Sequence, residues 1–254
     1  MSGLTVISRQ GGAFPDRDSV LRAINPLGAF RTESRRSAST MLATGHPVCA
    51  PSGDKRFYED GEIIGMFAGD IVNTDLLNWA DIARTLHDDS ALIALLKRLK
   101  GSFVLAVYDL RDEVLRVATD SFAFQPLYFQ VGEKSVTFST SIRTFSQLAE
   151  GKCNHSANWV YQYLFFNYPA GNVSPVENVH RVPAGTLGKY SVKSGDLNWI
   201  QYQNPISRGE KTITDQDAID QAVDIFGSVV SEWFDINGRV AFGLSGGLDC
   251  RTVL

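Results

Sequence analysis

The chain has 254 residues, of which 44% are hydrophobic and 20% are charged, and its formal net charge is −4. This composition is typical of a globular protein, and the weak negative charge argues against binding to a nucleic-acid backbone. The three cysteines are widely spaced, so neither a disulfide framework nor a zinc site is predicted. No apolar run approaches the roughly 20 residues that span a bilayer, and no signal sequence is evident. We therefore expect a cytoplasmic protein without membrane partners.

The first seventy residues contain two predicted strands, GLTVISR (3–9) and EIIGMFAGDIVN (62–73). Both are rich in the β-branched and aromatic residues that favour strands. The polar segment from Arg31 to Thr44 is expected to form a loop.

The segment 88–101, DDSALIALLKRLKG, is predicted to be a helix that Asp89 or Ser90 caps and Gly101 ends. Its leucines repeat at helical spacing and form one apolar face. Four short runs rich in Val, Phe, Tyr and Thr then predict antiparallel strands as far as Phe145.

A second helix is predicted over HSANWVYQYLFFN (155–167), with Ser156 as its cap and Pro169 beyond its end. The segments GTLGKYSV (185–192) and DLNWIQYQ (196–203) predict a further hairpin. Strands flanked by helices in this order indicate a layered α+β domain over residues 1–202.

A polar linker over 203–214 separates this domain from a second region, 215–254. That region begins with an amphipathic helix, DQDAIDQAVDIFGSVVSEWF (215–234). RVAFGL (239–244) is then an unbroken apolar run, as expected of a strand buried in a parallel sheet.

The glycine-rich string SGGLD follows this predicted strand and precedes a predicted helix, CRTVL. Such a turn directs backbone N–H groups and a helix dipole at one point, which favours a phosphate or pyrophosphate. Gly246 and Gly247 allow close approach to the anion, and Asp249 is expected to stabilise the loop or to help place Mg²⁺. A plain glycine turn is the alternative. The string lacks the lysine of a GxxxxGK[ST] loop, which excludes a Walker-type site.

Several motifs occur in the same order as in one known family. LSGGLDC (244–250) resembles the SGGxDS pyrophosphate loop of the asparagine synthetase family and its relatives. AGDIVN (68–73) is similar to its Asn-Gly-Glu-Ile-Tyr-Asn motif, and GSFVLAVYD (101–109) to its Gly-x-Phe-Ala-Phe-x-x-Tyr-Asp strand. ATDSFAFQPLYF (118–129) resembles Arg-Asp-x-x-Gly-x-x-Pro-Leu-Tyr-Tyr, and RVPAG (181–185) resembles Leu-Pro-Pro-Gly.

The resemblance implies an N-terminal-nucleophile-hydrolase-like αββα sandwich, as in class II glutamine amidotransferases, followed by the start of an α/β ATP pyrophosphatase domain. It implies an ATP-dependent amide-forming ligase that activates a carboxylate as an acyl-adenylate, with ATP and Mg²⁺ as cofactors. Glutamine, ammonia or an amine supplies the nitrogen. The second domain would be incomplete, so we expect the chain to be the N-terminal part of a longer ligase. The implied ATP-binding and pyrophosphate-binding residues are Leu244, Ser245, Gly246, Gly247, Leu248, Asp249 and Cys250.

The glutamine-hydrolysing half departs from the family pattern. Ser2 stands where the family has its N-terminal nucleophilic cysteine, and Ala68 stands where an asparagine completes the oxyanion hole. No Arg-Gly-Pro-Asp loop is evident. The resemblance places glutamine contacts at Gly69, Asp70 and Asp89, although helix capping explains Asp89 equally well.

Three hypotheses therefore compete. The first is a ligase with an eroded glutaminase domain, as in relatives that form intramolecular amides. The second is a working glutamine amidohydrolase that uses Ser2. The third is a catalytically silent scaffold for a synthetase partner.

Overall fold

The computed structural model describes residues 3–25, 27–47, 56–149, 152–204, 213–237, 243 and 247–253. The chain divides into two compact units, Met1–Pro205 and Ile206–Leu254. The predicted boundaries, with a first domain over 1–202 and a linker over 203–214, stay predictions.

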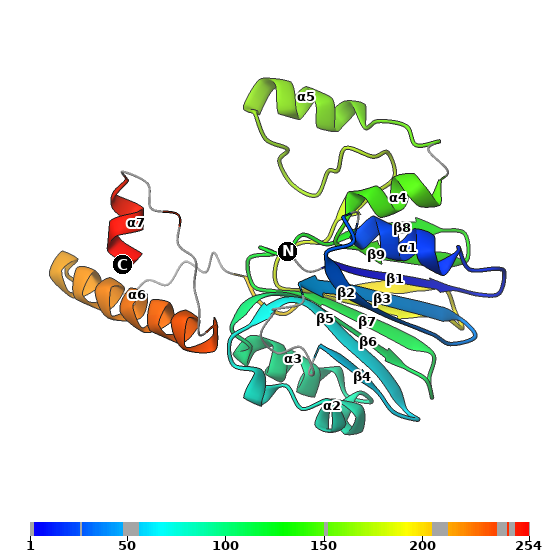
Figure 1. Cartoon of the computed structure of the whole chain (residues 1–254), viewed down its shortest axis with the longest axis horizontal. Helices are drawn as coiled ribbons and strands as arrows, with labels where there is room; N and C mark the ends of the chain where they lie inside the picture. Colours follow the sequence, from blue (N-terminus) through cyan, green and yellow to red (C-terminus); the bar gives the residue numbers. More distant parts are fainter. Residues whose placement is uncertain are drawn as a thin grey trace. The chain divides into compact units, whose positions relative to one another are not determined.

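The described part of the first unit contains two antiparallel sheets of six strands each (Figure 1). Sheet A consists of β1 (Gly3–Arg9), β2 (Phe30–Arg36), β3 (Thr40–Pro47), β8 (Tyr128–Gly132), β9 (Ser135–Ser139) and β10 (His180–Arg181). Sheet B consists of β4 (Phe57–Glu59), β5 (Ile63–Ile71), β6 (Gly101–Asp109), β7 (Val114–Thr119), β11 (Thr186–Ser191) and β12 (Leu197–Gln201). The strand order is β10-β8-β9-β1-β3-β2 in sheet A and β12-β11-β7-β6-β5-β4 in sheet B.

Helices cover the outer faces of both sheets. The helices α1 (Arg17–Ile24) and α4 (Ile142–Leu148) lie on sheet A, where Val20 and Ile24 pack with Ile7 and Met41. The helices α2 (Trp79–Thr85) and α3 (Asp89–Arg98) lie on sheet B, after a short 3-10 turn over Thr74–Leu76. The layer order is helix, sheet, sheet, helix, so the predicted αββα sandwich is confirmed.

The main core lies between the sheets. Leu4 and Val6 of β1 meet Ile64, Met66 and Ala68 of β5 there, together with side chains of β6 and β7. The other face of β5 is also buried, because Ile63 and Phe67 pack under α2 and α3. This double burial explains why EIIGMFAGDIVN reads as a nearly continuous apolar run in an antiparallel sheet.

The prediction of a loop from Arg31 to Thr44 is wrong. This segment forms most of the hairpin of β2 and β3, in which Phe30 pairs with Pro47 and Arg36 with Met41. The strand β2 lies at the edge of sheet A, where charged side chains are common because they block pairing with other chains. Its sequence is therefore polar although its backbone is extended.

The predicted helices of the first unit are present, with changes at both ends of α3. This helix ends at Arg98, and Gly101, which was expected to end it, is the first residue of β6. The N-cap of α3 is Asp88, whose carboxylate accepts from the Ser90 N–H, so Asp89 is the first helical residue and not the cap. The helix α5 (Ala157–Phe166) begins after Ser156, whose hydroxyl accepts from the Trp159 N–H, as predicted. The hairpin of β11 and β12 is also confirmed.

In the second unit the structure describes two helices, α6 (Asp215–Asn237) and α7 (Leu248–Val253). The amphipathic helix predicted over 215–234 is therefore present and is three residues longer at its end. Of the strand predicted over 239–244, only Gly243 is among the described residues, so this strand stays a prediction, and Leu244, Ser245 and Gly246 of the glycine-rich loop lie outside them.

A search of the described residues finds no helix with the length and apolarity that crossing a membrane requires.

A buried hydroxyl pair joins the two sheets. The Ser39 Oγ, beside the β2–β3 turn, lies 2.7 Å from the Tyr108 hydroxyl of β6, and it donates to Glu113 at 3.2 Å. Tyr108 is 1% exposed, so its hydroxyl has no access to bulk water in place of Ser39.

Replacing Tyr108 by Phe should therefore lower the free energy of unfolding by about 1 kcal/mol, the usual net value of a buried hydrogen bond. Urea unfolding of the natural chain and of Tyr108→Phe measures the difference. The matched control is Tyr163→Phe on the exposed surface of α5, which should change stability much less. Equal effects at both sites would show that the contact between the sheets contributes nothing.

Candidate functional site

At one end of sheet B, the paired backbones of β5 and β6 leave no room for a side chain at two positions. Gly69 and Gly101 both adopt positive φ, +96° and +134°. A Cβ at Gly69 would lie 2.0 Å from the Ser102 carbonyl oxygen, and one at Gly101 would lie 2.1 Å from the Asp70 carbonyl oxygen. Only glycine fits at both positions, so the backbone at this end of the sheet is not covered by side chains from residues 69 and 101.

Ala68, next to Gly69, faces the core between the sheets. It is fully buried and belongs to the apolar cluster that contains Leu4, Met66 and Val104. At the position where the resemblance implies an amide donor, the structure thus has a methyl group among hydrocarbon neighbours. The side chain supplies no hydrogen bond to a developing oxyanion.

Asp70 is held by a buried arginine. The Arg56 Nη2 donates to the Asp70 carboxylate at 2.8 Å, and the Arg56 Nη1 donates to the Gly69 carbonyl oxygen. The Arg56 guanidinium also lies 5.0 Å from the centre of the Phe67 ring. The Arg56 side chain is 1% exposed, whereas that of Asp70 is 48% exposed. Asp70 therefore keeps one face open to a ligand.

Asp89 is bound by two cations. One carboxylate oxygen accepts from the Arg116 Nε at 2.8 Å, and the other accepts from the Lys189 Nζ at 2.6 Å. Arg116 also donates to the Leu86 carbonyl oxygen at 2.6 Å. Burial by itself would raise the pKa of Asp89, but the hydrogen bonds from Lys189 and Arg116 outweigh it and hold this pKa below its ordinary value.

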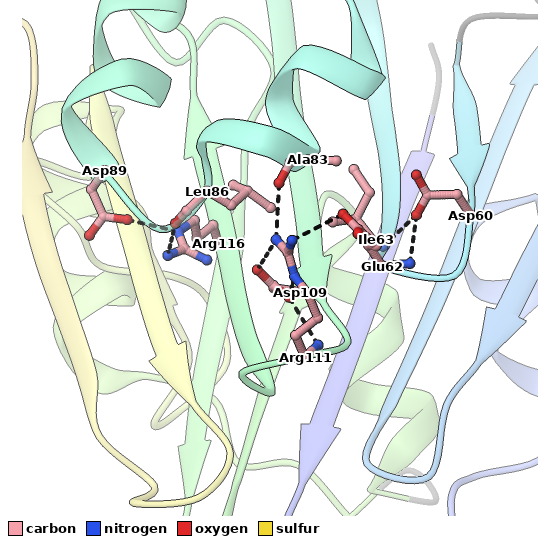
Figure 2. A network of polar contacts seen from close by, with 9 residues as sticks. All are labelled: Asp60, Glu62, Ile63, Ala83, Leu86, Asp89, Asp109, Arg111 and Arg116. Atoms are coloured by element: carbon pink, nitrogen blue, oxygen red, sulfur yellow. Dashed lines mark hydrogen bonds and ion pairs between the residues drawn. The ribbon is translucent and has the colours of Figure 1, made fainter.

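A parallel arrangement surrounds Arg111 (Figure 2). Its guanidinium donates to Asp109 at 2.9 Å, to Glu62 at 3.0 Å and to the Ala83 carbonyl oxygen at 2.9 Å. Burial would raise the pKa of Asp109, and the hydrogen bonds from Arg111 reverse this and lower it. Both networks attach α2 to sheet B, which is a structural role.

The structure brings together some of the predicted glutamine-site residues and separates others. Gly69 and Asp70 are adjacent at the end of β5, where Asp70 pairs with Ser102. Asp89 contacts Arg116, which pairs with Val107 of β6. These two rows lie about 17 Å apart along β6 at roughly 3.4 Å per residue. The glutamine contact predicted for Asp89 stays a prediction, and its carboxylate already accepts hydrogen bonds from two cations.

The other predicted site residues are only partly described. Ser2 lies outside the described residues. Gly247 precedes α7, and Asp249 is exposed in the first turn of this helix. The Cys250 thiol contacts the Gly243 carbonyl oxygen at 3.6 Å. Among the residues that the structure describes, no group of three or more His, Cys, Asp or Glu side chains is arranged to hold a metal ion.

Comparison with known proteins agrees with the architecture. The αββα layers define a sandwich of the N-terminal-nucleophile-hydrolase type. Residues 90–203 match the glutamine amidotransferase domain family. The match includes neither Ala68, Gly69 and Asp70 nor Asp89, so it gives those residues no role.

Solved structures show weaker likeness. One is a glutamine phosphoribosylpyrophosphate amidotransferase from B. subtilis complexed with ADP and GMP, which is 11% identical with a TM-score of 0.49. The match covers 82% of this chain and 50% of that one. The allosteric regulatory enzyme of purine biosynthesis gives 12% identity, a TM-score of 0.44 and coverage of 82% and 44%. A glutamine aminotransferase class-II domain protein from Silicibacter pomeroyi is 9% identical, with a TM-score of 0.35. That match covers 82% of this chain and 100% of the other. The chain thus spans half or less of the first two proteins. A search of curated protein sequences finds no match.

The sequence analysis did not identify Arg56, Arg116 and Lys189, the cations that bind Asp70 and Asp89. Arg116 does carry a signal, because it is the one charged residue in the run VLRVAT (114–119). A charge in a buried strand needs a partner of opposite sign. The partner itself lies 27 residues away, and Lys189 lies 100 residues from Asp89, so the sequence does not identify the contacts.

Replacing Asp89 by Asn should lower the free energy of unfolding by about 2 kcal/mol, because the nearly buried Arg116 loses its counter-charge. The value is below the roughly 3–5 kcal/mol of a fully buried pair because the Asp89 side chain keeps 20% exposure. The control is Asp81→Asn, which removes an exposed pair with Arg84 and should cost about 0.5 kcal/mol or less. Urea unfolding at neutral pH separates the two, and a loss at Asp89 no larger than at Asp81 would contradict the assignment.

The same pair gives a pH dependence of defined sign. Because the pKa of Asp89 is lower in the folded chain than in the unfolded chain, the unfolded state binds the proton more readily. The stabilisation is present above the unfolded pKa of about 3.9 and is lost as the pH falls through the folded pKa. Between about pH 5 and pH 3 the natural chain should therefore lose stability more steeply than Asp89→Asn. Parallel stability curves for the two proteins would rule this out.

Proposed function

We propose that the chain is the N-terminal part of an ATP-dependent amide-forming ligase whose glutamine amidotransferase domain no longer hydrolyses glutamine at a useful rate. The observation that carries the second half of this proposal is Ala68, a buried methyl group where an oxyanion donor is expected. Losing one such donor costs about 10²–10³ in rate. Serine at position 2 adds a second defect, because a hydroxyl is harder to activate than a thiol.

The ligase half of the proposal is supported by the LSGGLDC string and by the helix that follows it. In the proposed reaction, a carboxylate oxygen attacks the α-phosphorus of ATP and pyrophosphate leaves. The nitrogen of ammonia or an amine then attacks the carbonyl carbon, AMP leaves with the C–O bond electrons, and the nitrogen loses a proton. Mg²⁺ would neutralise the phosphates. The described residues do not by themselves complete a site for either the nucleotide or the metal.

A working glutaminase is the second candidate. The family match favours it. The half-exposed carboxylate of Asp70 also favours it, because this carboxylate can accept hydrogen bonds from the ammonium group of an amino acid. A silent scaffold that supports a synthetase partner is the third, and it shares the loss of glutaminase activity with the first.

The first test is glutamate release from glutamine by the chain with its initiator methionine removed, as verified by mass spectrometry. We expect no release above background from the natural chain. We also expect none from Ser2→Cys alone, because the nucleophile and the oxyanion donor are separate requirements. The double variant Ser2→Cys/Ala68→Asn tests whether those two defects suffice to explain the loss.

Thermal melting of each variant shows whether it is folded, and Ser2→Ala is the control for the nucleophile. Robust release by the natural chain that disappears in Ser2→Ala would establish the glutaminase candidate and overturn the silent domain.

The second test addresses the ligase in the complete product of the natural gene. ATP–pyrophosphate exchange in the presence of candidate carboxylates, aspartate first, should be lost in Asp249→Ala while the first unit stays folded. The expected reason is that Asp249 belongs to the pyrophosphate loop. Asp224→Ala on the exposed surface of α6 is the matched control. Undiminished exchange in Asp249→Ala would show that the loop assignment is wrong.

A further inference from the structure

A cavity lies within the first unit, beside the edge strands β10 and β12. It has a volume of about 430 Å³ and is lined by residues of β8, β10, β11 and β12. The strands β10 and β12 are the edge strands of sheets A and B on this side. The volume falls within the range of about 300–1,000 Å³ that small-molecule sites occupy. Its described lining includes none of the predicted glutamine-site residues.

Aromatic rings form one wall of this cavity. The centre of the Trp199 ring lies 4.9 Å from that of Phe129, and Phe129 lies 5.6 Å from His180. Trp199 remains 38% exposed, although it also touches Phe138 of the core. The wall is therefore anchored in the sandwich and still presents ring surface to a ligand.

A glycine keeps Trp199 in this position. Gly188 of β11 pairs with Trp199 of β12, and a Cβ at Gly188 would lie 2.6 Å from the indole ring. The indole therefore lies directly against the backbone of β11. Any larger residue at position 188 would push the ring away and change the shape of the cavity.

The polar part of the lining is neutral or basic. Arg181 lines the cavity, and one of its guanidinium nitrogens donates to the Ala123 carbonyl oxygen at 2.9 Å, which fixes the side chain. Gln201 adds an amide, and the described lining contains no acidic side chain. A fixed guanidinium with no carboxylate beside it favours an anion.

We propose that this cavity binds a flat aromatic molecule that carries a carboxylate or a phosphate group. The ring packs on Trp199 and Phe129, and the anion meets Arg181. The proposal goes beyond the ligase assignment and does not depend on it, because it uses only residues at the other edge of the sandwich.

Titration of the full chain with four probes tests the proposal. The probes are 2-naphthoate, 2-naphthyl phosphate, the neutral 2-naphthylmethanol and the aliphatic anion octanoate. Protein-observed NMR follows the Trp199 indole N–H, assigned with Trp199→Leu, and the backbone amides of the lining residues, which also report binding in that variant. We expect at least one aromatic anion to bind with a dissociation constant below about 1 mM, and naphthylmethanol and octanoate to bind about tenfold more weakly. The stronger of the two aromatic anions identifies the anionic group.

Variants assign the contacts. Arg181→Gln should weaken the binding of the aromatic anions about tenfold and leave the binding of naphthylmethanol unchanged. Arg181→Lys should retain most of the affinity for the anions. Trp199→Leu should weaken every aromatic probe. The matched controls are Arg143→Gln, an exposed residue of α4, and Trp159→Leu in α5, and neither should change binding.

Melting temperatures verify that each variant is folded. If Trp199→Leu does not fold, the proposal is tested by comparing the binding of the aromatic anions to Arg181→Gln and to Arg181→Lys. Equal binding of naphthylmethanol and the aromatic anions, unchanged affinity in Arg181→Gln, or no binding of any probe at about 5 mM would each overturn the proposal.

Discussion

The attachment of α2 to sheet B by two arginines is the constraint on which this side of the sandwich depends. A helix of seven residues is too short to be stable alone, and its last carbonyl groups have no partners within the helix. Arg111, in the turn between β6 and β7, and Arg116 of β7 donate to the Ala83 and Leu86 carbonyl oxygens (Figure 2). Each guanidinium is in turn neutralised by an aspartate. The same two side chains thus bind carbonyl oxygens at the end of α2 and form ion pairs with Asp109 and Asp89.

This arrangement changes the interpretation of Asp89. The residue stands near the start of a helix, where a carboxylate is expected either to cap or to bind a ligand. Asp88 performs the capping, and Asp89 balances Arg116 and Lys189. A ligand ammonium group would have to share this partly buried carboxylate with two cations that repel it. Asp70, held by one cation and half exposed, does not carry this penalty.

Much of the architecture follows from local patterns in the sequence. The helix α3 and the hairpin of β11 and β12 have strong periodicity and clear caps or turns, and both were predicted. The hairpin of β2 and β3 was not, because the polar residues of an edge strand resemble those of a loop. The two-sided burial of β5 also shows a limit of the method. An unbroken apolar run indicates a strand covered on both faces, but it does not distinguish a parallel from an antiparallel sheet once helices cover the outer face.

The candidate site was predictable only where chemistry is carried by adjacent residues. Ala68, Gly69 and Asp70 could be aligned with a motif, and the motif itself showed what Ala68 lacks. Arg56 was not predictable, because nothing in KRFYED indicates that this arginine turns inward to bind Gly69 and Asp70. Contacts between residues distant in the sequence depend on strand order and register, which local patterns do not specify.

The fold and the glutaminase chemistry make different demands at position 68. An asparagine there would place an amide among Leu4, Met66 and Val104, and a buried amide without partners is unfavourable by about 1–3 kcal/mol. Alanine removes that cost and fills the site with a methyl group that matches its neighbours. A sandwich that has lost the oxyanion donor is therefore expected to be as stable as one that keeps it, or more stable. This is why an intact αββα core is compatible with a silent glutamine site, and why stability alone does not reveal whether the domain is active.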